Sequence, residues 1–192
     1  MLVPHIINQE DNFIGGWYMK DNSICSDLID LFEFSEDKKI GVLGLDEYID
    51  KTIKNSTDLC VESYSQDPII KNYLKILQEV INQYKKQYIY SDKLQQRWGI
   101  SEGINIQKYK PTQGYYAYHY ERTGHSKRIL AFITYLNTIK DGGGTEFFYQ
   151  QFKTKAEKGL TIICPAEWTH THRGVISNTE TKYIITGWFS YL

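Results

Sequence analysis

The sequence is short of cysteine, carries no excess of either charge and has no long apolar run, and each shortage excludes a class of protein. Its three cysteines are odd in number, lie far apart and lack the Cys-x-x-Cys spacing of zinc and redox sites: Cys25, Cys60 and Cys164. We therefore expect reduced, mostly buried thiols in a reducing compartment. The longest apolar stretch, residues 129–136, is far too short to cross a bilayer, so we interpret it as a buried strand.

The charge balance gives no indication of a polyanionic partner. Lysine and arginine number 22 against 23 for aspartate and glutamate, so the chain has no long-range positive field that would hold DNA or RNA. The N-terminus lacks the basic start and the apolar block of a signal peptide. At 192 residues the chain fits one domain with a good core. We expect a soluble, cytoplasmic protein that binds neither nucleic acid nor membrane.

Residues 1–103 are expected to be a mostly helical support region. Asn22 or Ser23 can cap a short helix whose apolar residues form one stripe: Leu28, Ile29, Leu31 and Phe32. A clearer helix begins at Asp67 and Pro68, a capping residue followed by proline at the first helical position. Its apolar residues recur every three or four positions, so this helix should lie across one face of a sheet.

Residues 104–192 are expected to be mostly β-structure, because the apolar period changes to two and turn signals multiply. The strand candidates are 104–110, 115–121, 128–136, 145–150, 160–164 and 183–189. Several short strands at this spacing, preceded by helices that can brace one sheet, favour a jelly roll over a parallel α/β sheet. The predicted fold class is mainly β with N-terminal helices (α+β), a jelly-roll core braced by helices, in a single domain.

A histidine and a carboxylate two residues apart, His119 and Glu121, are the first candidate metal ligands. In a strand, residues i and i+2 project from the same face, so the two side chains could hold one cation. A second histidine from a distant strand, His170 or His172, would complete a 2-His-1-carboxylate triad of the kind that non-haem Fe(II) oxygenases use. Taken alone the pair is weak evidence, because an exposed strand can carry the same two residues.

A lysine near the C-terminus supplies a cation that needs a partner. By strand parity Lys182 shares a face with Ile184, Thr186 and Trp188. If that face is inward, the buried ammonium requires an anion, which a dicarboxylate ligand would supply. The phenol of Tyr135, on an apolar strand, could be a second donor to the same anion.

Six short runs carry a resemblance to a known family. They are Tyr-His-Tyr-Glu at 118–121, Ile-Thr-Tyr-Leu-Asn at 133–137, Gly-Gly-Thr-Glu-Phe at 143–147, Lys-Gly-Leu at 158–160, His-Arg-Gly at 172–174 and Lys-Tyr-Ile-Ile-Thr-Gly-Trp at 182–188. In order and spacing, these runs make residues 104–190 resemble the double-stranded β-helix core of Fe(II)- and 2-oxoglutarate-dependent dioxygenases, in the prolyl 4-hydroxylase-like group.

The resemblance implies cofactors and a role for each site residue. Iron ligands are implied at three positions: His119, Glu121 and His172. Contacts with 2-oxoglutarate are implied at four more, of which the first would pair with the far carboxylate: Lys182, Tyr135, Tyr109 and Thr186. The implied cofactors are Fe(II), 2-oxoglutarate and O2, with ascorbate as a further candidate. The implied chemistry is hydroxylation of a C–H bond coupled to decarboxylation of 2-oxoglutarate to succinate and CO2.

Two positions depart from the family pattern or leave a choice. Most members have aspartate where this chain has Glu121, and the extra methylene moves the carboxylate outward by about one C–C bond. We interpret the change as a tolerated variation. The family spacing to the basic residue favours His172 over His170 as the iron ligand. His170 then becomes a group behind a ligand, a substrate-side group or a surface residue.

The substrate is not fixed by the sequence. A peptidyl proline is our first hypothesis, although related sites act on free amino acids and small metabolites. A catalytically inactive jelly-roll binding or structural protein is an alternative that Glu121 favours, whereas Lys182 and Tyr135 argue against it. A zinc hydrolase is a weaker alternative, because no general base is evident beside the triad. Four tyrosines could line a substrate groove, or could simply be packed: Tyr115, Tyr116, Tyr118 and Tyr120.

Overall fold

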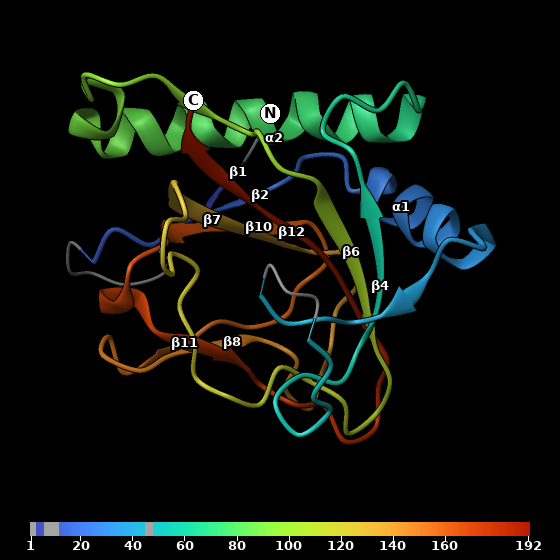
Figure 1. The fold of residues 1–192 in the computed structure, drawn as a ribbon. Helices are drawn as coiled ribbons and strands as arrows, with labels where there is room; N and C mark the ends of the chain where they lie inside the picture. The colour runs from blue at the N-terminus through green and yellow to red at the C-terminus, as the bar shows by residue number, and fades with distance from the viewer. Residues whose placement is uncertain (1–2, 6–11, 45–47) are drawn as a thin grey trace.

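The structure is a computed structural model that describes residues 3–5, 12–44 and 48–192. It contains a layer of helices, a large antiparallel sheet and a small antiparallel sheet (Figure 1). The long helix runs across the top of the large sheet in this view, and the small sheet lies at the bottom. Within the described ranges, no helix combines the length and apolarity needed to cross a membrane.

Two α-helices and two 3-10 turns are found in the described residues: α1 (Ser23–Phe34), α2 (Pro68–Gln87), η1 (Ile89–Asp92) and η2 (Trp168–His170). The predicted cap of α2 is confirmed, because the Asp67 carboxylate accepts hydrogen bonds from the amides of Ile69 and Ile70 at 2.7 and 3.3 Å. The predicted cap position of α1 is confirmed, because Asn22 is its N-cap residue, but the Asn22 side chain makes no capping hydrogen bond.

The large sheet has nine strands. Their bounds are β1 (Val3–His5), β2 (Gly15–Tyr18), β3 (Lys39–Ile40), β4 (Thr57–Val61), β5 (Trp98–Gly99), β6 (Ile104–Tyr109), β7 (Arg128–Tyr135), β10 (Leu160–Pro165) and β12 (Lys182–Tyr191). The order is β1-β2-β10-β7-β12-β6-β4-β3, and β5 pairs with the end of β12. The small sheet has the order β11-β8-β9, from β8 (Thr145–Phe147), β9 (Phe152–Lys153) and β11 (His172–Gly174).

The N-terminal part of the chain contributes more β-structure than predicted. Residues 1–103 supply the strands β1 to β5 as well as both α-helices, so the predicted mostly helical region is wrong in this respect. Two of these strands join the sheet through distant partners, β2 with β10 and β4 with β6. The strands are two to five residues long, too short to show an alternating apolar pattern in the sequence.

Two of the strand predictions after residue 104 are wrong in kind or extent. Residues 115–121 form an extended segment with isolated bridges rather than a strand. The strand predicted at 145–150 ends at Phe147, where a turn begins. Tyrosine-rich composition favours extended backbone, but a strand also needs a neighbour over several residues, and these segments meet one only briefly.

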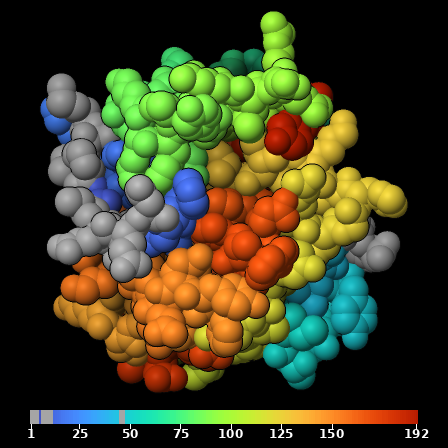
Figure 2. Space-filling view, turned by 90° about the vertical axis from the view of Figure 1, so that its left-hand side faces the viewer, coloured from blue at the N-terminus to red at the C-terminus, as the bar shows by residue number. Residues whose placement is uncertain are grey.

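Alternate residues of the large sheet enter two different cores. Phe132 and Ile185 belong to the core on the helix side, together with Tyr73 of α2. Tyr135 and Ile184 belong to the second core, on the side of the small sheet. The space-filling view shows α2, in green, above the orange segments that surround the small sheet (Figure 2). The second side of the large sheet is where the polar residues of β12 gather.

Candidate functional site

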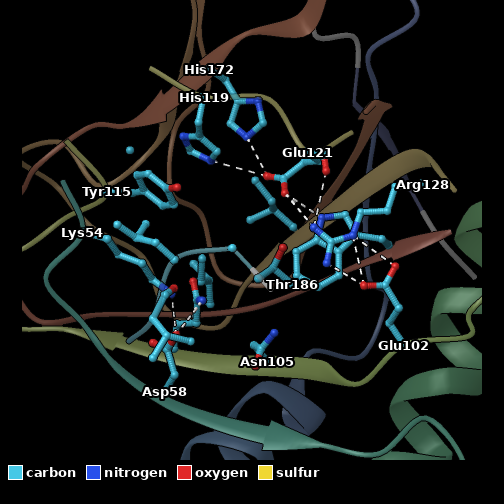
Figure 3. Close-up of a pocket in the computed structure, with 18 of the residues that line it drawn as sticks. Lys54, Asp58, Glu102, Asn105, Tyr115, His119, Glu121, Arg128, His172 and Thr186 are labelled. Carbon is cyan, nitrogen blue, oxygen red and sulfur yellow. Dashed lines mark hydrogen bonds and ion pairs between the residues drawn. The ribbon is translucent and has the colours of Figure 1, made fainter. Parts of the chain in front are cut away.

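A cavity of about 600 Å³ lies against the second side of the large sheet. The predicted parity of β12 is confirmed there, because four alternate residues all line it: Lys182, Ile184, Thr186 and Trp188. The three candidate metal ligands line the same cavity: His119, Glu121 and His172 (Figure 3). The fold thus brings His119 and Lys182, which are 63 positions apart in the sequence, into one cavity.

Backbone hydrogen bonds hold the extended segment that carries two of these ligands. The amide of His119 donates to the carbonyl of His172, and the amide of His172 donates back, both at 2.9 Å. The amide of Glu121 donates to the carbonyl of Ala166 at 3.0 Å. Both side chains therefore point into the cavity, as the i and i+2 spacing predicted, although the segment is not a strand.

The two imidazoles are oriented by the same kind of contact. Nδ1 of His119 lies 3.1 Å from the carbonyl oxygen of Ala117, and Nδ1 of His172 lies 2.8 Å from that of His170. A carbonyl accepts only from a protonated Nδ1, which leaves the lone pair on Nε2, the arrangement found in metal-bound histidines. Both Nε2 atoms face Oε1 of Glu121, at 3.4 and 3.5 Å.

This cluster has the donor set and the geometry of a metal site. One potential ligand atom from each of the three residues lies within 4.8 Å of the others. Burial raises the pKa of Glu121, but when His119 and His172 are protonated on both nitrogens, their hydrogen bonds and positive charges outweigh burial and hold the pKa well below the usual range. Two imidazoles and an ionised carboxylate on one side suit a divalent ion with open positions.

Lys182 is a buried cation without an ion-pair partner among the described residues. The residue is 5% exposed. Its ammonium lies 4.7 Å from the ring centroid of Tyr109, on the neighbouring strand. Burial lowers the pKa of Lys182 to about 8. Because an unpaired ammonium is costly to bury, this end of the cavity fits an anionic ligand.

The three other predicted cosubstrate residues, Tyr135, Tyr109 and Thr186, also line the cavity. Each hydroxyl has a partner within the protein, at 2.7 to 2.8 Å: Thr145 and Thr154 for Tyr135, Gln107 for Tyr109, and the carbonyl of Phe132 for Thr186. The structure therefore brings all seven predicted site residues to one cavity, and a ligand would have to share or replace these hydroxyl contacts.

His170 does not lie on the same side as His172, although two residues that are two positions apart in one strand would. It ends the 3-10 turn η2, whereas His172 begins β11. Its side chain is buried, with Nε2 2.7 Å from the carbonyl oxygen of Asn12. The imidazole of His170 thus lies neither on the surface nor in the cavity. The contact of His170 with the imidazole of His172 is made by its backbone carbonyl.

Of the four tyrosines that could have lined a substrate groove, only Tyr115 lines the cavity. Its ring stacks on that of His119 at 3.6 Å between centroids and 11° between planes. Tyr118 and Tyr120 are exposed. Alternation along the extended segment separates these residues onto two sides.

A buried ion pair in the cavity wall was not foreseen. Nζ of Lys54 lies 2.6 Å from Oδ2 of Asp58, which also accepts a hydrogen bond from Nε2 of Gln107 at 3.1 Å. In the sequence, two polar residues two positions apart in a predicted strand, Asn105 and Gln107, could have indicated that one side of that strand faces a polar cavity. Lys54 and Asp58 gave no signal, because their place depends on the pairing of β4 with β6.

Comparisons with known proteins agree with a site for a metal ion and an anionic ligand. Residues 104–190 match the model of the 2OG-Fe(II) oxygenase superfamily. No curated protein matches the sequence. Two similar solved structures are the viral collagen prolyl hydroxylase of Paramecium bursaria Chlorella virus-1 with 2OG (17% identity, 98% of this chain and 99% of that one, TM-score 0.69) and a Pseudomonas putida prolyl-4-hydroxylase (14%, 95% and 94%, 0.71).

A third similar structure is a prolyl hydroxylase from Trichoplax adhaerens in complex with a hypoxia inducible factor peptide fragment (13% identity, 94% of this chain and 84% of that one, TM-score 0.75). At such identities the likeness shows a shared fold. The family match covers the part of the chain that carries the cluster and Lys182. Residues 104–190 therefore match the 2OG-Fe(II) oxygenase superfamily, whose members use Fe(II), 2-oxoglutarate and O2.

Proposed function

We propose that the protein is an Fe(II)- and 2-oxoglutarate-dependent dioxygenase that hydroxylates an unactivated C–H bond, with a peptidyl proline as substrate. The observation that carries the proposal is that one cavity contains both the 2-His-1-carboxylate cluster and a buried ammonium that has no counter-ion among the residues the structure describes. The cluster suits a metal with open positions, and the ammonium suits a dicarboxylate. A zinc hydrolase would leave Lys182 without a task.

The residues have separate tasks in this proposal. His119, Glu121 and His172 would hold Fe(II), and Lys182 would pair with the far carboxylate of 2-oxoglutarate. Tyr135, Tyr109 and Thr186 would line the cosubstrate: Tyr135 is fixed by two threonine hydroxyls. Bound iron and 2-oxoglutarate supply O2 activation and the oxidising power. The protein fixes both partners and limits the access of water.

The proposal includes a double-stranded β-helix core over residues 104–192, within one domain that spans the whole chain. The fold shared with three prolyl hydroxylases supports it. The peptide in the Trichoplax complex belongs to that enzyme, and by analogy we propose a peptide or protein partner here. Ascorbate, which could keep the iron reduced, is a further proposed cofactor.

A free amino acid or small polar metabolite is the second candidate substrate class. The observation that favours it is the Lys54 and Asp58 pair in the wall of the cavity, which Asn105 also lines (Figure 3). An ammonium and a carboxylate side by side could recognise the opposite charges of an amino acid. A prolyl ring would leave these groups unused.

The proposed function can be tested by anaerobic titration of the purified protein with Fe(II) and then 2-oxoglutarate. We expect a saturable, weak visible charge-transfer band from the chelate. The protein should then be offered proline-containing peptides and, separately, free amino acids, with succinate formation and one added oxygen atom as readouts. Hydroxylation of free amino acids alone would favour the second candidate.

Bound iron without such a band would contradict the dioxygenase proposal and favour a catalytically inactive jelly-roll protein. A band with no hydroxylated product from either substrate set would leave the cosubstrate role standing but refute both substrate classes. The titration therefore separates the metal site, the cosubstrate site and the substrate into three independent results.

The affinity for 2-oxoglutarate should depend on pH through Lys182. The pKa of this group in the ligand-free protein is about 8, and only the ammonium attracts a carboxylate. Below that pH the affinity should be constant. Above it, each further pH unit should weaken binding about tenfold, because a proton must be taken up on binding. Titrations of the iron-loaded protein between pH of about 7 and about 9.5 measure this.

Lys182→Arg is the matched control for the pH dependence. The guanidinium stays charged throughout this range, so the variant should show a flat affinity even if its absolute affinity is lower. Any pH dependence that remains in the variant comes from other groups. A wild-type affinity that is flat up to the end of the range would refute the assignment of Lys182 as the cosubstrate cation.

A further inference from the structure

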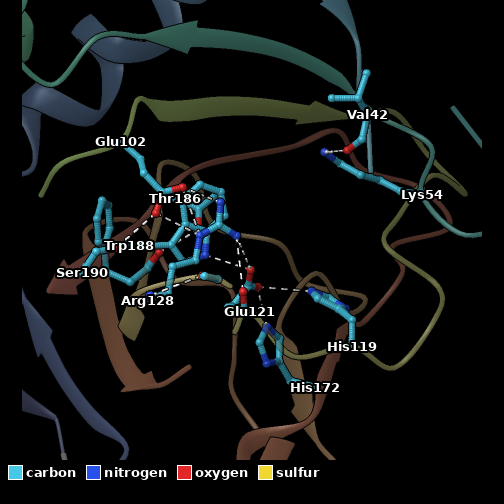
Figure 4. A network of polar contacts seen from close by, with 12 residues as sticks. Val42, Lys54, Glu102, His119, Glu121, Arg128, His172, Thr186, Trp188 and Ser190 are labelled. Atoms are coloured by element: carbon cyan, nitrogen blue, oxygen red, sulfur yellow. Dashed lines mark hydrogen bonds and ion pairs between the residues drawn. The ribbon is translucent and has the colours of Figure 1, made fainter. Parts of the chain in front are cut away.

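Glu121 has two oxygens with different partners. Oε1 faces Nε2 of His119 and of His172 at 3.4 and 3.5 Å. Oε2 accepts a hydrogen bond from Nε1 of Trp188 at 2.8 Å (Figure 4). The indole N–H is a donor only, so this contact fixes which oxygen is turned toward the imidazoles and which is turned away.

The indole of Trp188 is itself held in place by Arg128. The guanidinium carbon lies 3.4 Å from the centroid of the ring, and Nη1 lies 3.7 Å from Oε2 of Glu121. Nε and Nη2 of Arg128 donate to the carboxylate of Glu102 at 2.5 to 3.0 Å. The hydroxyl of Ser190 donates to the same carboxylate at 3.1 Å. A continuous set of contacts therefore runs from β12 to Glu121.

A break in strand register brings Arg128 to this place. In the pairing of β7 with β12, Trp188 lies opposite Ala131 and Phe189 opposite Leu130, but Ser190 lies opposite Arg128. The register shift leaves Ile129 without a residue opposite it in β12, and it moves Arg128 from the helix side of the sheet to the cavity side. Bulges re-aim side chains in this way next to functional sites.

We propose that Trp188, stacked on Arg128, is a positioning residue that makes glutamate, and not aspartate, the correct third ligand in this chain. The inference rests on the proposed metal site. The backbone of Glu121 is fixed by the hydrogen bond to Ala166. Aspartate at this position would draw the carboxylate back by about 1.5 Å, one C–C bond. It could then not reach Trp188 and the imidazoles together.

The experiment is a double-mutant cycle on metal affinity that requires no turnover. Co(II) serves as the probe, with its visible absorption as the readout, in the wild type, Trp188→Phe, Glu121→Asp and the double variant. Phenylalanine keeps an aromatic ring for Arg128 but removes the N–H donor. The matched control is Trp98→Phe, since the indole of Trp98 donates to the carbonyl of Ser91, away from the cavity.

Each single variant is expected to weaken Co(II) binding about 10- to 100-fold, the usual effect of losing a contact that orients a ligand. The double variant should bind about as weakly as Glu121→Asp alone, because the shorter carboxylate no longer reaches the indole. Trp98→Phe should bind Co(II) like the wild type. The absorption spectrum should change in Trp188→Phe, which a general loss of stability would not produce.

Two results would overturn the proposal: Glu121→Asp binds Co(II) as tightly as the wild type, or the two single effects multiply in the double variant. The first result overturns the proposal even if Trp188→Phe does not fold, because it is measured on Glu121→Asp alone. If the wild type itself fails to bind Co(II), the proposed metal site falls and this inference falls with it. Wild-type binding with an unaffected Glu121→Asp refutes only the positioning role.

Discussion

Replacement of His172 by alanine is expected to abolish iron binding and turnover while the fold is kept. Its Nε2 is one of only three ligand atoms in the cluster, and no other imidazole in the described residues points to that place. Loss of a group that merely orients a ligand costs about 10- to 100-fold in affinity, so loss of the ligand itself should exceed this. Metal content, the visible band and succinate formation measure the effect.

His170→Ala is the matched control, because it removes a buried imidazole two residues away whose side chain contacts Asn12 rather than the cavity. It should retain iron binding, although its thermal stability should fall. Circular dichroism of both variants checks that they fold. Wild-type succinate formation by His172→Ala would contradict the ligand assignment, and loss of iron in His170→Ala alone would reverse the choice between the two histidines.

Replacement of Lys182 by methionine is expected to stabilise the ligand-free protein while it weakens cosubstrate binding. The pKa of this lysine falls from 10.5 to about 8 on burial. At about 1.36 kcal/mol per pH unit, this difference corresponds to a cost of about 3 kcal/mol at neutral pH. A hydrogen bond to a charged group is worth about 1.5–3 kcal/mol, so the affinity for 2-oxoglutarate should fall roughly 10- to 150-fold.

The size of this stability gain depends on pH in a defined way. Between pH 8 and 10.5 the unfolded chain holds a proton on Lys182 that the folded protein has released. Wild-type stability therefore rises with pH across this window. The advantage of Lys182→Met should be full below pH of about 8 and should disappear by about 10.5. Denaturant unfolding at several pH values, without and with 2-oxoglutarate, measures both effects.

Lys54→Met is the matched control, since Lys54 is equally buried but is paired with Asp58 at 2.6 Å. Removal of one partner of a buried ion pair is destabilising by about 3–5 kcal/mol. The same substitution should therefore have opposite signs at the two lysines. A loss of stability in Lys182→Met at neutral pH would mean that the ammonium has an internal partner and that the cavity is not prepared for an anion.

Local patterns in the sequence were sufficient for the elements with a strong period. The cap and apolar stripe predicted α2, and the two-residue alternation of β12 predicted that Lys182 and Thr186 share a side with Trp188. The i and i+2 spacing placed His119 beside Glu121 even though no strand forms there. These features depend on neighbours within a few residues, so the sequence records them directly.

The contacts between distant segments were decided by the tertiary structure alone. A turn before β11 puts His172 in the cavity and His170 outside it. Pairing of β4 with β6 places Lys54 in the wall, and the register shift at Ser190 turns Arg128 toward Glu121. The last two depend on which residues lie opposite one another in two strands. A one-residue shift in that pairing reverses the side of every residue beyond it, and no local period in the sequence records such a shift.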